Sequence, residues 1–337
     1  MRIGIHVGHW EGQPHDLVAL AVEAERAGLD SVWTSETWGS DALLLLTWIA
    51  ARTERIGLGT AAVQMPGRTP AAAAMAALTL DHLSGGRLRL GLGVSGPQVA
   101  EGWHGVPFDH PLERTREYVA LVRSVLRRDA PVTSPGPHYP LPLPGGEGKP
   151  LKSNVRPLRA EVPIYLAAMG PSNVALAAEI AQGWIPFLYS PEKAGVFEDQ
   201  IADGLKTGGR ERAELDVAPM VPVATGEDVE ACRDRLRPLL ALYAGGMGSR
   251  RSNFYHALVT RYGYGEAADA IREAFLEGRR SEATALVPDA MIDELCLLGS
   301  AGRVRERLGV WRTAGVTTLL AKVNDVETIR ALAEAAA

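Results

Sequence analysis

The sequence is poor in cysteine, with only Cys232 and Cys296 among its 337 residues. Their spacing fits no metal-binding pattern, and two thiols in so long a chain indicate a reducing compartment rather than a disulfide-stabilised secreted fold. Long apolar runs are also missing, because the longest, Ala42–Ala51, is flanked by charged residues and is too short to span a bilayer. The strand-like sequence that follows Met1 leaves no room for a signal peptide. We therefore expect a cytoplasmic protein with no membrane partner and no metal ion.

An excess of one charge is absent as well. The chain has 35 Lys and Arg against 40 Asp and Glu, a formal net charge of -5, and this balance gives no support to a nucleic-acid partner. Hydrophobic residues make up 46% of the chain and charged residues 22%, as in an ordinary globular protein with ample material for a core.

Strand-like and helix-like segments alternate along the whole chain. We expect strands at 2–8, 30–34, 55–63, 87–94, 162–168, 183–188, 215–224 and 317–323. We expect helices at 14–27, 41–52, 70–83, 112–128, 171–181, 191–207, 228–243, 301–314 and 326–335. Roughly eight strand–helix units is the count that a (β/α)₈ TIM barrel requires. A doubly wound sheet shows the same local alternation, so that alternative stays open at this point.

Two segments interrupt this alternation. Residues 129–160 are rich in proline and glycine, and residues 244–298 are mostly helical in pattern. A length of 337 residues allows two domains, but an α/β barrel also reaches this size as one. We predict a single α/β domain over 1–337, a TIM barrel with two insertions at about 129–160 and 244–298.

Small residues gather where three of the expected strands end. Gly59–Ala62 and Gly91–Gly96 leave room for a flat ring or a phosphate to approach the backbone. The second segment also matches the dinucleotide fingerprint G-x-G-x-x-G, but it lies on the fourth strand and is followed by Pro97 instead of a long helix. Gly170–Pro171 opens a helix whose free N–H groups suit a phosphate. Tight turns and an ordinary helix start explain the same residues without a ligand.

The segments 57–70, 91–105 and 165–171, with Asp81–Arg87 and 299–314, resemble the bacterial luciferase-like monooxygenase family. Within it, the chain is similar to the branch that uses the deazaflavin coenzyme F420 (8-hydroxy-5-deazaflavin) instead of FMN. The resemblance covers essentially the whole chain. It implies an F420-dependent oxidoreductase that transfers a hydride between the deazaflavin ring and a small organic substrate. It also implies a homodimer, formed near the alanine-rich helix at Ala71–Leu78.

The resemblance implies a cofactor site at the strand ends. Relatives hold the ring against a bulge after the third strand that contains a non-prolyl cis peptide, and place the phosphate arm along the fourth-strand loop and the fifth-strand helix start. The cofactor-binding residues implied are Thr60, Ala61, Ala62, Gln64, Gly93, Val94, Ser95, Gly96, Ala168, Met169, Gly170 and Pro171. Arg68, Lys152 and Arg156 lie in loops that could supply positive charge to the anionic arm.

The candidate acid and base residues also lie at strand ends. His6 and His9 close the first strand, Glu36 the second, and His104 follows the fourth. The family keeps a carboxylate at the position of Glu36, and histidine titrates near neutral pH. We therefore predict Glu36, helped by His9 or His104, as the catalytic residues, although a structural hydrogen bond explains any single histidine equally well.

Three tryptophans, Trp10, Trp38 and Trp103, are expected at the same end, where they would wall an apolar substrate pocket or fill the core. Two functional alternatives also stay open. One is an FMN-dependent, two-component monooxygenase of the same family, and the other is a family member that has lost its cofactor.

Overall fold

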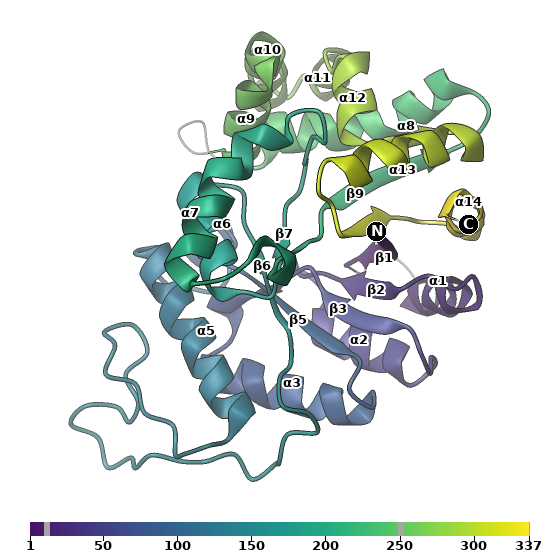
Figure 1. Cartoon of the computed structure of the whole chain (residues 1–337). Coiled ribbons are helices and arrows are strands. Elements are labelled where there is room, and N and C mark those ends of the chain that lie inside the picture. The colour runs from purple at the N-terminus through teal and green to yellow at the C-terminus, as the bar shows by residue number, and fades with distance from the viewer. Residues whose placement is uncertain (10–13, 249–252, 337) are drawn as a thin grey trace.

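The computed structural model describes residues 1–9, 14–248 and 253–336 (Figure 1). The strands are β1 (Arg2–Gly8), β2 (Ser31–Thr34), β3 (Gly57–Thr60), β4 (Val63–Gln64), β5 (Leu88–Gly93), β6 (Ile164–Ala167), β7 (Gly183–Ile185), β8 (Asp216–Val217), β9 (Met220–Thr225), β10 (Leu297–Gly299) and β11 (Thr318–Lys322). The helices that alternate with them are α1 (Pro14–Arg26), α2 (Ala42–Ala50), α3 (Pro70–Leu83), α4 (Pro97–Ala100), α5 (Pro111–Arg127), α6 (Pro171–Ile180), α7 (Glu198–Gly208), α8 (Val229–Ala241), α13 (Ala301–Thr313) and α14 (Val326–Ala336). Between α8 and β10 lie α9 (Phe254–Val259), α10 (Gly265–Leu276), α11 (Arg280–Ala285) and α12 (Asp289–Leu295). Short 3-10 turns at Met65–Gly67 (η1), Ala194–Phe197 (η2) and Arg212–Glu214 (η3), and π-helical turns at Leu242–Gly246 (η4) and Thr260–Tyr264 (η5), complete the set.

The parallel strands form a closed barrel. Neighbouring strands pair in the order β10-β9-β11-β1-β2-β3-β5-β6-β7-β8, and β4 continues β3 beside β5. The ring closes where Phe187, after β7, bridges Met220 of β9, and where the Thr317 N–H donates to Val217 O across 3.1 Å. This architecture confirms the predicted TIM barrel. The carboxyl ends of the strands therefore meet at one mouth, where such barrels carry their sites.

Large aromatic side chains fill the barrel interior opposite glycines. Trp33 and Tyr165 meet edge to face, with ring centroids 5.2 Å apart. A Cβ at Gly59 would stand 2.2 Å from the Trp33 ring, and one at Gly183 would stand 2.0 Å from the Tyr165 ring. Glycine is therefore required at both positions by the volume of the neighbouring ring. The interior cluster contains Trp33, Ala61, Tyr165, Ile185, Ala218 and Leu320.

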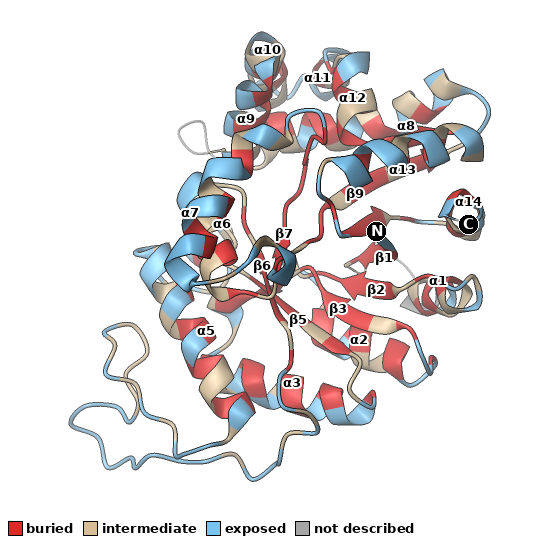
Figure 2. Cartoon of the chain, viewed as in Figure 1, coloured by how far each residue is buried: buried red, intermediate tan, exposed pale blue. Residues whose placement is uncertain are grey.

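The helices cover the outside of the barrel with one apolar face each. Figure 2 shows buried residues along the strands and on the inner sides of the helices. In α3 the predicted cap is confirmed, because the Thr69 side chain accepts a hydrogen bond from Ala72 N. Among the described ranges, none of the helices has both the length and the apolar character needed to cross a bilayer.

The structure differs from the sequence prediction at a few element boundaries. The expected strand 55–63 is interrupted at Ala61–Ala62, and 215–224 is divided before Pro219, which has no N–H for a strand ladder. The expected helix 191–207 begins as a 3-10 turn at Ala194 and becomes α7 only at Glu198. Two short elements were missed, α4 in the loop after the fourth strand and β10 at the end of the second interruption.

Candidate active site at the barrel mouth

The third strand ends in a bulge that is tied to its neighbours on both sides. The Thr60 hydroxyl accepts from Gly91 N and donates to Gly91 O, both at 2.8 Å. On the other side, Ala61 N donates to Thr34 O across 2.6 Å. The peptide bond between Ala61 and Ala62 is cis. Because Thr60 is fully buried and both its hydrogen bonds are used, its side chain holds the bulge in place.

Three of the segments implied as cofactor-binding meet at Gly93. Gln64 pairs with Gly93 in register, and Gly93 pairs with Ala167 on the next strand. A Cβ at Gly93 would lie 3.5 Å from Ala62 Cβ and 3.7 Å from Ala167 Cβ. These strand ends therefore form a smooth floor of small side chains. Val94, Ser95 and Gly96 continue from it toward α4, and Ser95 takes a left-handed backbone with φ of 62°.

Glu36 is the centre of a hydrogen-bond network beside this floor. Its carboxylate accepts from Gln64 N and from Arg68 Nη1, each at 2.8 Å, and from Ala42 N at 3.3 Å. Only 8% of the Glu36 side chain is exposed, and Arg68 also pairs with Asp41. The carboxylate therefore has partners on both oxygens, and it fixes the residues that follow the bulge. The catalytic role of Glu36 stays a prediction.

His104 extends the same network. Its Nε2 lies 2.8 Å from Gln64 Oε1, and because a carbonyl oxygen only accepts, the histidine carries a proton there. A Cβ at Gly67 would lie 2.9 Å from His104 Cε1, so the ring packs flush on a glycine of η1. The structure thus brings Glu36, Gln64 and His104 together. His9 follows β1 at the same end of the barrel, one strand further from the bulge than Glu36.

The start of α6 lies next to the floor. Gly170 has an extended backbone at the N-cap, and Pro171 is the first helical residue, as expected. Within the described part of the chain no side chain caps this helix, so its first N–H groups remain available. Ala168 and Met169 connect β6 to this helix start.

Two of the three expected positive charges have partners of their own. Arg68 is held by Glu36 and Asp41, and Lys152 Nζ donates to the carbonyl of Asp129.

The expectation for the tryptophans also changes. Trp38 and Trp103 are 54% and 63% exposed, so neither fills the core, and Trp10 lies outside the described residues.

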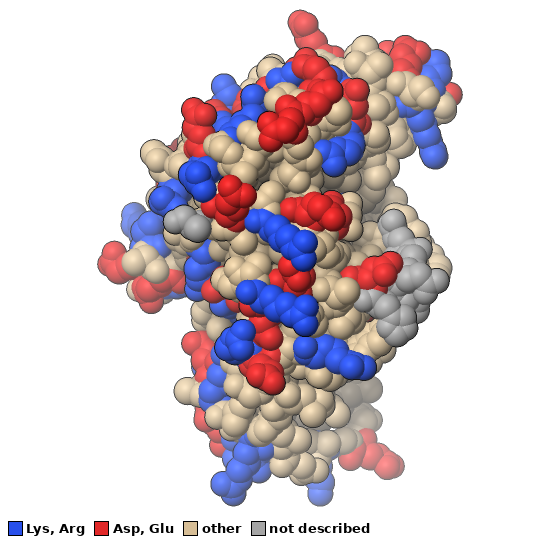
Figure 3. All heavy atoms as spheres, turned by 90° about the vertical axis from the view of Figure 1, so that its right-hand side faces the viewer, with Lys and Arg blue, Asp and Glu red and all other residues tan. Residues whose placement is uncertain are grey.

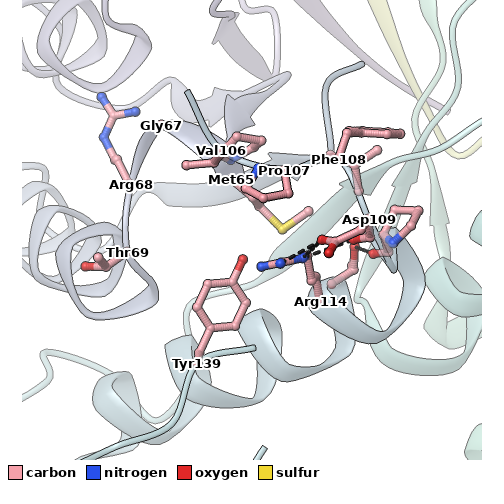
Figure 4. A pocket seen from close by; sticks show the side chains of 14 residues that line it. Met65, Gly67, Arg68, Thr69, Val106, Pro107, Phe108, Asp109, Arg114 and Tyr139 are labelled. Carbon is pink, nitrogen blue, oxygen red and sulfur yellow. Dashed lines mark hydrogen bonds and ion pairs between the residues drawn. The ribbon is translucent and has the colours of Figure 1, made fainter. Parts of the chain in front are cut away.

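A cavity of about 300 Å³ lies immediately outside the floor, beyond Met65 and Val94 (Figure 4). Its walls are mainly apolar, and in one wall the Arg114 guanidinium points toward the Tyr139 hydroxyl and binds Asp109, with Nε 2.8 Å from Oδ1. This cavity was not predicted, because its residues come from η1, the 106–109 loop, α5 and the first interruption. Its lining residues are Met65, Pro66, Gly67, Arg68, Thr69, Val94, Val106, Pro107, Phe108, Asp109, Pro111, Arg114, Thr115 and Tyr139.

On the side of the barrel away from β3, three aromatic residues pack together. Phe187 lies 4.5 Å from Tyr243 and 6.0 Å from Tyr255 between ring centroids, and the two tyrosines are 4.7 Å apart. Tyr243 belongs to η4 and Tyr255 to α9, so only Tyr255 of this aromatic cluster comes from the second interruption. Its tyrosines are only a weak signal in the sequence, because aromatic residues in a helical pattern are usually core.

Comparison with known proteins agrees with this geometry. The family model of the luciferase-like monooxygenases matches residues 2–318. The chain belongs to the luciferase-like monooxygenase family. A Mycobacterium tuberculosis protein, named provisionally as a coenzyme F420-dependent oxidoreductase, is 46% identical over 99% of this chain and 98% of its own length.

More distant relatives extend the comparison. The 5,10-methylenetetrahydromethanopterin reductase of Archaeoglobus fulgidus is 29% identical over 88% of this chain and 86% of its own. The solved structure of the coenzyme F420-dependent tetrahydromethanopterin reductase from Methanopyrus kandleri superposes with a TM-score of 0.85 at 23% identity, covering 98% of this chain and 97% of that one. At this identity the superposition shows the shared luciferase-like barrel.

Proposed function

We propose that this luciferase-like protein is a coenzyme F420-dependent oxidoreductase that transfers a hydride between the deazaflavin ring and a small organic substrate. The observation that carries the proposal is the floor around Gly93, where neighbouring strand ends present methyl groups or no side chain at all. A planar ring needs such a surface, and a Cβ-sized group at Gly93 would begin to fill it. The 46% identity to the M. tuberculosis protein along nearly the whole chain supports the same cofactor.

The residues at the mouth fit this group in distinct ways. Ala61, Ala62 and Gly93 would lie under the ring, and the uncapped N-terminus of α6 at Gly170 and Pro171 would face the phosphate. When bound, the deazaflavin supplies a ring carbon that gives or accepts a hydride. Here the protein's contribution is to bind and orient both partners and to manage the proton that accompanies the hydride.

We assign the proton handling to the network of Glu36, Gln64 and His104. His104 carries a titratable ring and is held by Gln64, whose backbone is in turn held by Glu36. Glu36, with its three donors, keeps this arrangement in position, and His9 is the second histidine at the same end.

Cofactor titration tests this proposal. The purified protein is titrated with coenzyme F420 and, separately, with FMN, and fluorescence quenching of each cofactor is followed. We expect micromolar binding of F420 and weak binding of FMN, and we expect the Gly93→Leu variant to bind neither. The reverse preference would support the FMN-dependent monooxygenase, which oxygen uptake with reduced FMN would then identify. Binding of neither would support a family member without a cofactor.

We also propose a homodimer formed through α2 and α3. These helices pack side by side and expose Leu44, Met75 and Leu83, which are 71%, 62% and 65% exposed. Large exposed apolar side chains grouped on adjacent helices are typical of an interface. A face turned away from this one, over α13 and α14, instead mixes both charge signs (Figure 3), with Arg330 of α14 paired to Glu23 of α1 at 2.8 Å.

The cytoplasmic location is a further proposal. Cys232 and Cys296 are both buried free thiols, which suits a reducing compartment. Burial is also the main cause that raises the pKa of Cys296 far above its ordinary value, so this thiol is unreactive.

A further inference from the structure

The inner face of β1 carries one polar side chain at the mouth. Gly4 pairs with Leu320, and His6 pairs with Trp33, and both of these partners belong to the cluster inside the barrel. Since neighbouring paired residues point to the same face of a sheet, the His6 imidazole points into the barrel. Gly8, two residues further along β1, has no side chain that could cover the His6 ring. His6 is therefore an interior residue at the end where ligands bind.

Within the residues that the structure describes, the His6 ring has no hydrogen-bond partner. Only 6% of the residue is exposed, and neither Nδ1 nor Nε2 is bonded to any part of the described chain. A buried polar group left unsatisfied destabilises a protein, and almost all such groups in native structures have a partner. A hydrogen bond to a bound ligand would satisfy a nitrogen of this ring, and it would explain why a histidine without a partner lies inside the barrel.

The surroundings of His6 keep it neutral. Burial is the main cause that lowers its pKa to about 3, and coulombic interactions with Lys322 and His9 lower it further. Lys322 is the register partner of His6 on β11, and His9 follows at the end of β1. A neutral imidazole has one N–H donor and one nitrogen acceptor. It therefore suits a neutral carbonyl or hydroxyl group and does not suit an anion.

We propose that His6 is a ligand-binding residue that hydrogen-bonds a neutral carbonyl or hydroxyl group of the molecule held at the barrel mouth. This rests on the proposed function for the identity of that molecule. Two sources carry the same chemistry, the carbonyl-bearing pyrimidine edge of the deazaflavin and a carbonyl or alcohol substrate. His6 would then position the ligand from the side opposite the phosphate anchor, while His104 manages the proton.

The first arm of the test measures stability without any ligand. His6→Leu removes the unsatisfied nitrogens and keeps an apolar side chain in place, so we expect Tm to rise by about 2–4 °C. His256→Leu is the matched control, because His256 Nε2 lies 3.0 Å from Asp269, and losing this partner should lower Tm or leave it unchanged. A Tm for His6→Leu that does not rise, or that falls, would overturn the proposal, since it would mean that His6 already has a partner in the free protein.

The second arm measures binding. Quenching titrations with coenzyme F420 compare the wild type with His6→Leu and His6→Gln, the latter keeping a neutral donor and acceptor. A Kd at least tenfold weaker in His6→Leu, largely restored in His6→Gln, identifies the cofactor as the partner. If the Kd is unchanged, acetone is added as a small carbonyl probe to F420-saturated protein labelled with [15N]histidine, and the signals that vanish in His6→Leu are followed.

A shift of those signals with acetone identifies the substrate as the partner. If they move with neither F420 nor acetone, the proposal is overturned. Failure of the proposed function gives a different result, because the wild type would then bind no F420 while the stability arm still reports whether the His6 ring is unsatisfied.

Discussion

Gly91 and Gly93 stand two residues apart on the inner face of β5, and we expect the same change to alanine to damage stability at one and binding at the other. A Cβ at Gly91 would lie 1.7 Å from the carbonyl oxygen of Thr60, a backbone atom that cannot rotate away. At Gly93 the nearest atoms to a new Cβ are the methyl groups of Ala62 and Ala167, at 3.5 and 3.7 Å, which is ordinary van der Waals contact. The first site therefore has no room for a methyl group, and the second has just enough.

The magnitudes follow from these distances. Gly91→Ala must push β3 from β5 and strain both hydrogen bonds between Thr60 and Gly91, so we expect a loss of about 3–5 kcal/mol in the free energy of unfolding. For a chain of this size that lowers Tm by roughly 4–7 °C. Gly93→Ala should change the free energy of unfolding by less than about 1 kcal/mol. It should weaken coenzyme F420 about tenfold, or about 1.4 kcal/mol, because the new methyl group occupies the floor on which the ring lies.

Differential scanning fluorimetry and the F420 quenching titration measure the two effects on the same samples. The reasoning is refuted if Gly93→Ala binds F420 as tightly as the wild type, because the ring then does not lie over Gly93. It is also refuted if the two variants lose the same stability, because the distances at the two glycines would then not determine the outcome.

Three further predictions rest on other contacts. Glu36→Gln should lower the free energy of unfolding by about 2 kcal/mol in urea denaturation, because it leaves Arg68 without its most buried partner, whereas the more exposed Asp41→Asn should cost less than about 1 kcal/mol. Met75→Glu should convert a homodimer to monomers in light scattering after size exclusion, and an unchanged mass would argue against the α2–α3 interface. For Glu25, burial raises the pKa, but hydrogen bonds from three backbone N–H groups just before β3 outweigh it, so the net shift is downward from 4.5. Its contribution to stability is therefore complete above pH 4.5 and lost as the pH falls below that value, and Glu25→Gln should flatten this part of a Tm-against-pH curve.

The sequence could predict the barrel because its strands are short apolar runs bounded by clear signals. The bounds of β1 and α3 agree residue for residue, since a Thr69–Pro70 cap and Gly8 mark them. The same local signals fail for β10, where Leu295–Leu298 reads equally well as the end of a helix or as a strand. Only pairing with β9, which is far away in sequence, makes it a strand.

The site was predictable to the extent that it depends on small residues. Glycine and alanine at strand ends indicate room for a ligand whatever their neighbours are, and Ala62, Gly93 and Ala167 do meet. The cavity beside Arg114 was not predictable, because Met65, Arg114 and Tyr139 are brought together only by the packing of a loop with no helical or strand pattern.

The roles of the titratable residues depend on hydrogen-bond partners that the sequence does not show. Glu36 and His6 read alike in the sequence, as polar residues at the ends of neighbouring strands. In the folded protein Glu36 accepts three hydrogen bonds, one of them from an arginine distant in sequence, whereas both His6 nitrogens are unsatisfied within the described chain. A polar group whose hydrogen bonds are all made within the protein stabilises the fold. A buried polar group without partners makes its hydrogen bonds only when a ligand binds. On this reasoning the residue that most needs a ligand at this barrel mouth is His6, and the Glu36 carboxylate builds the wall beside which that ligand would lie.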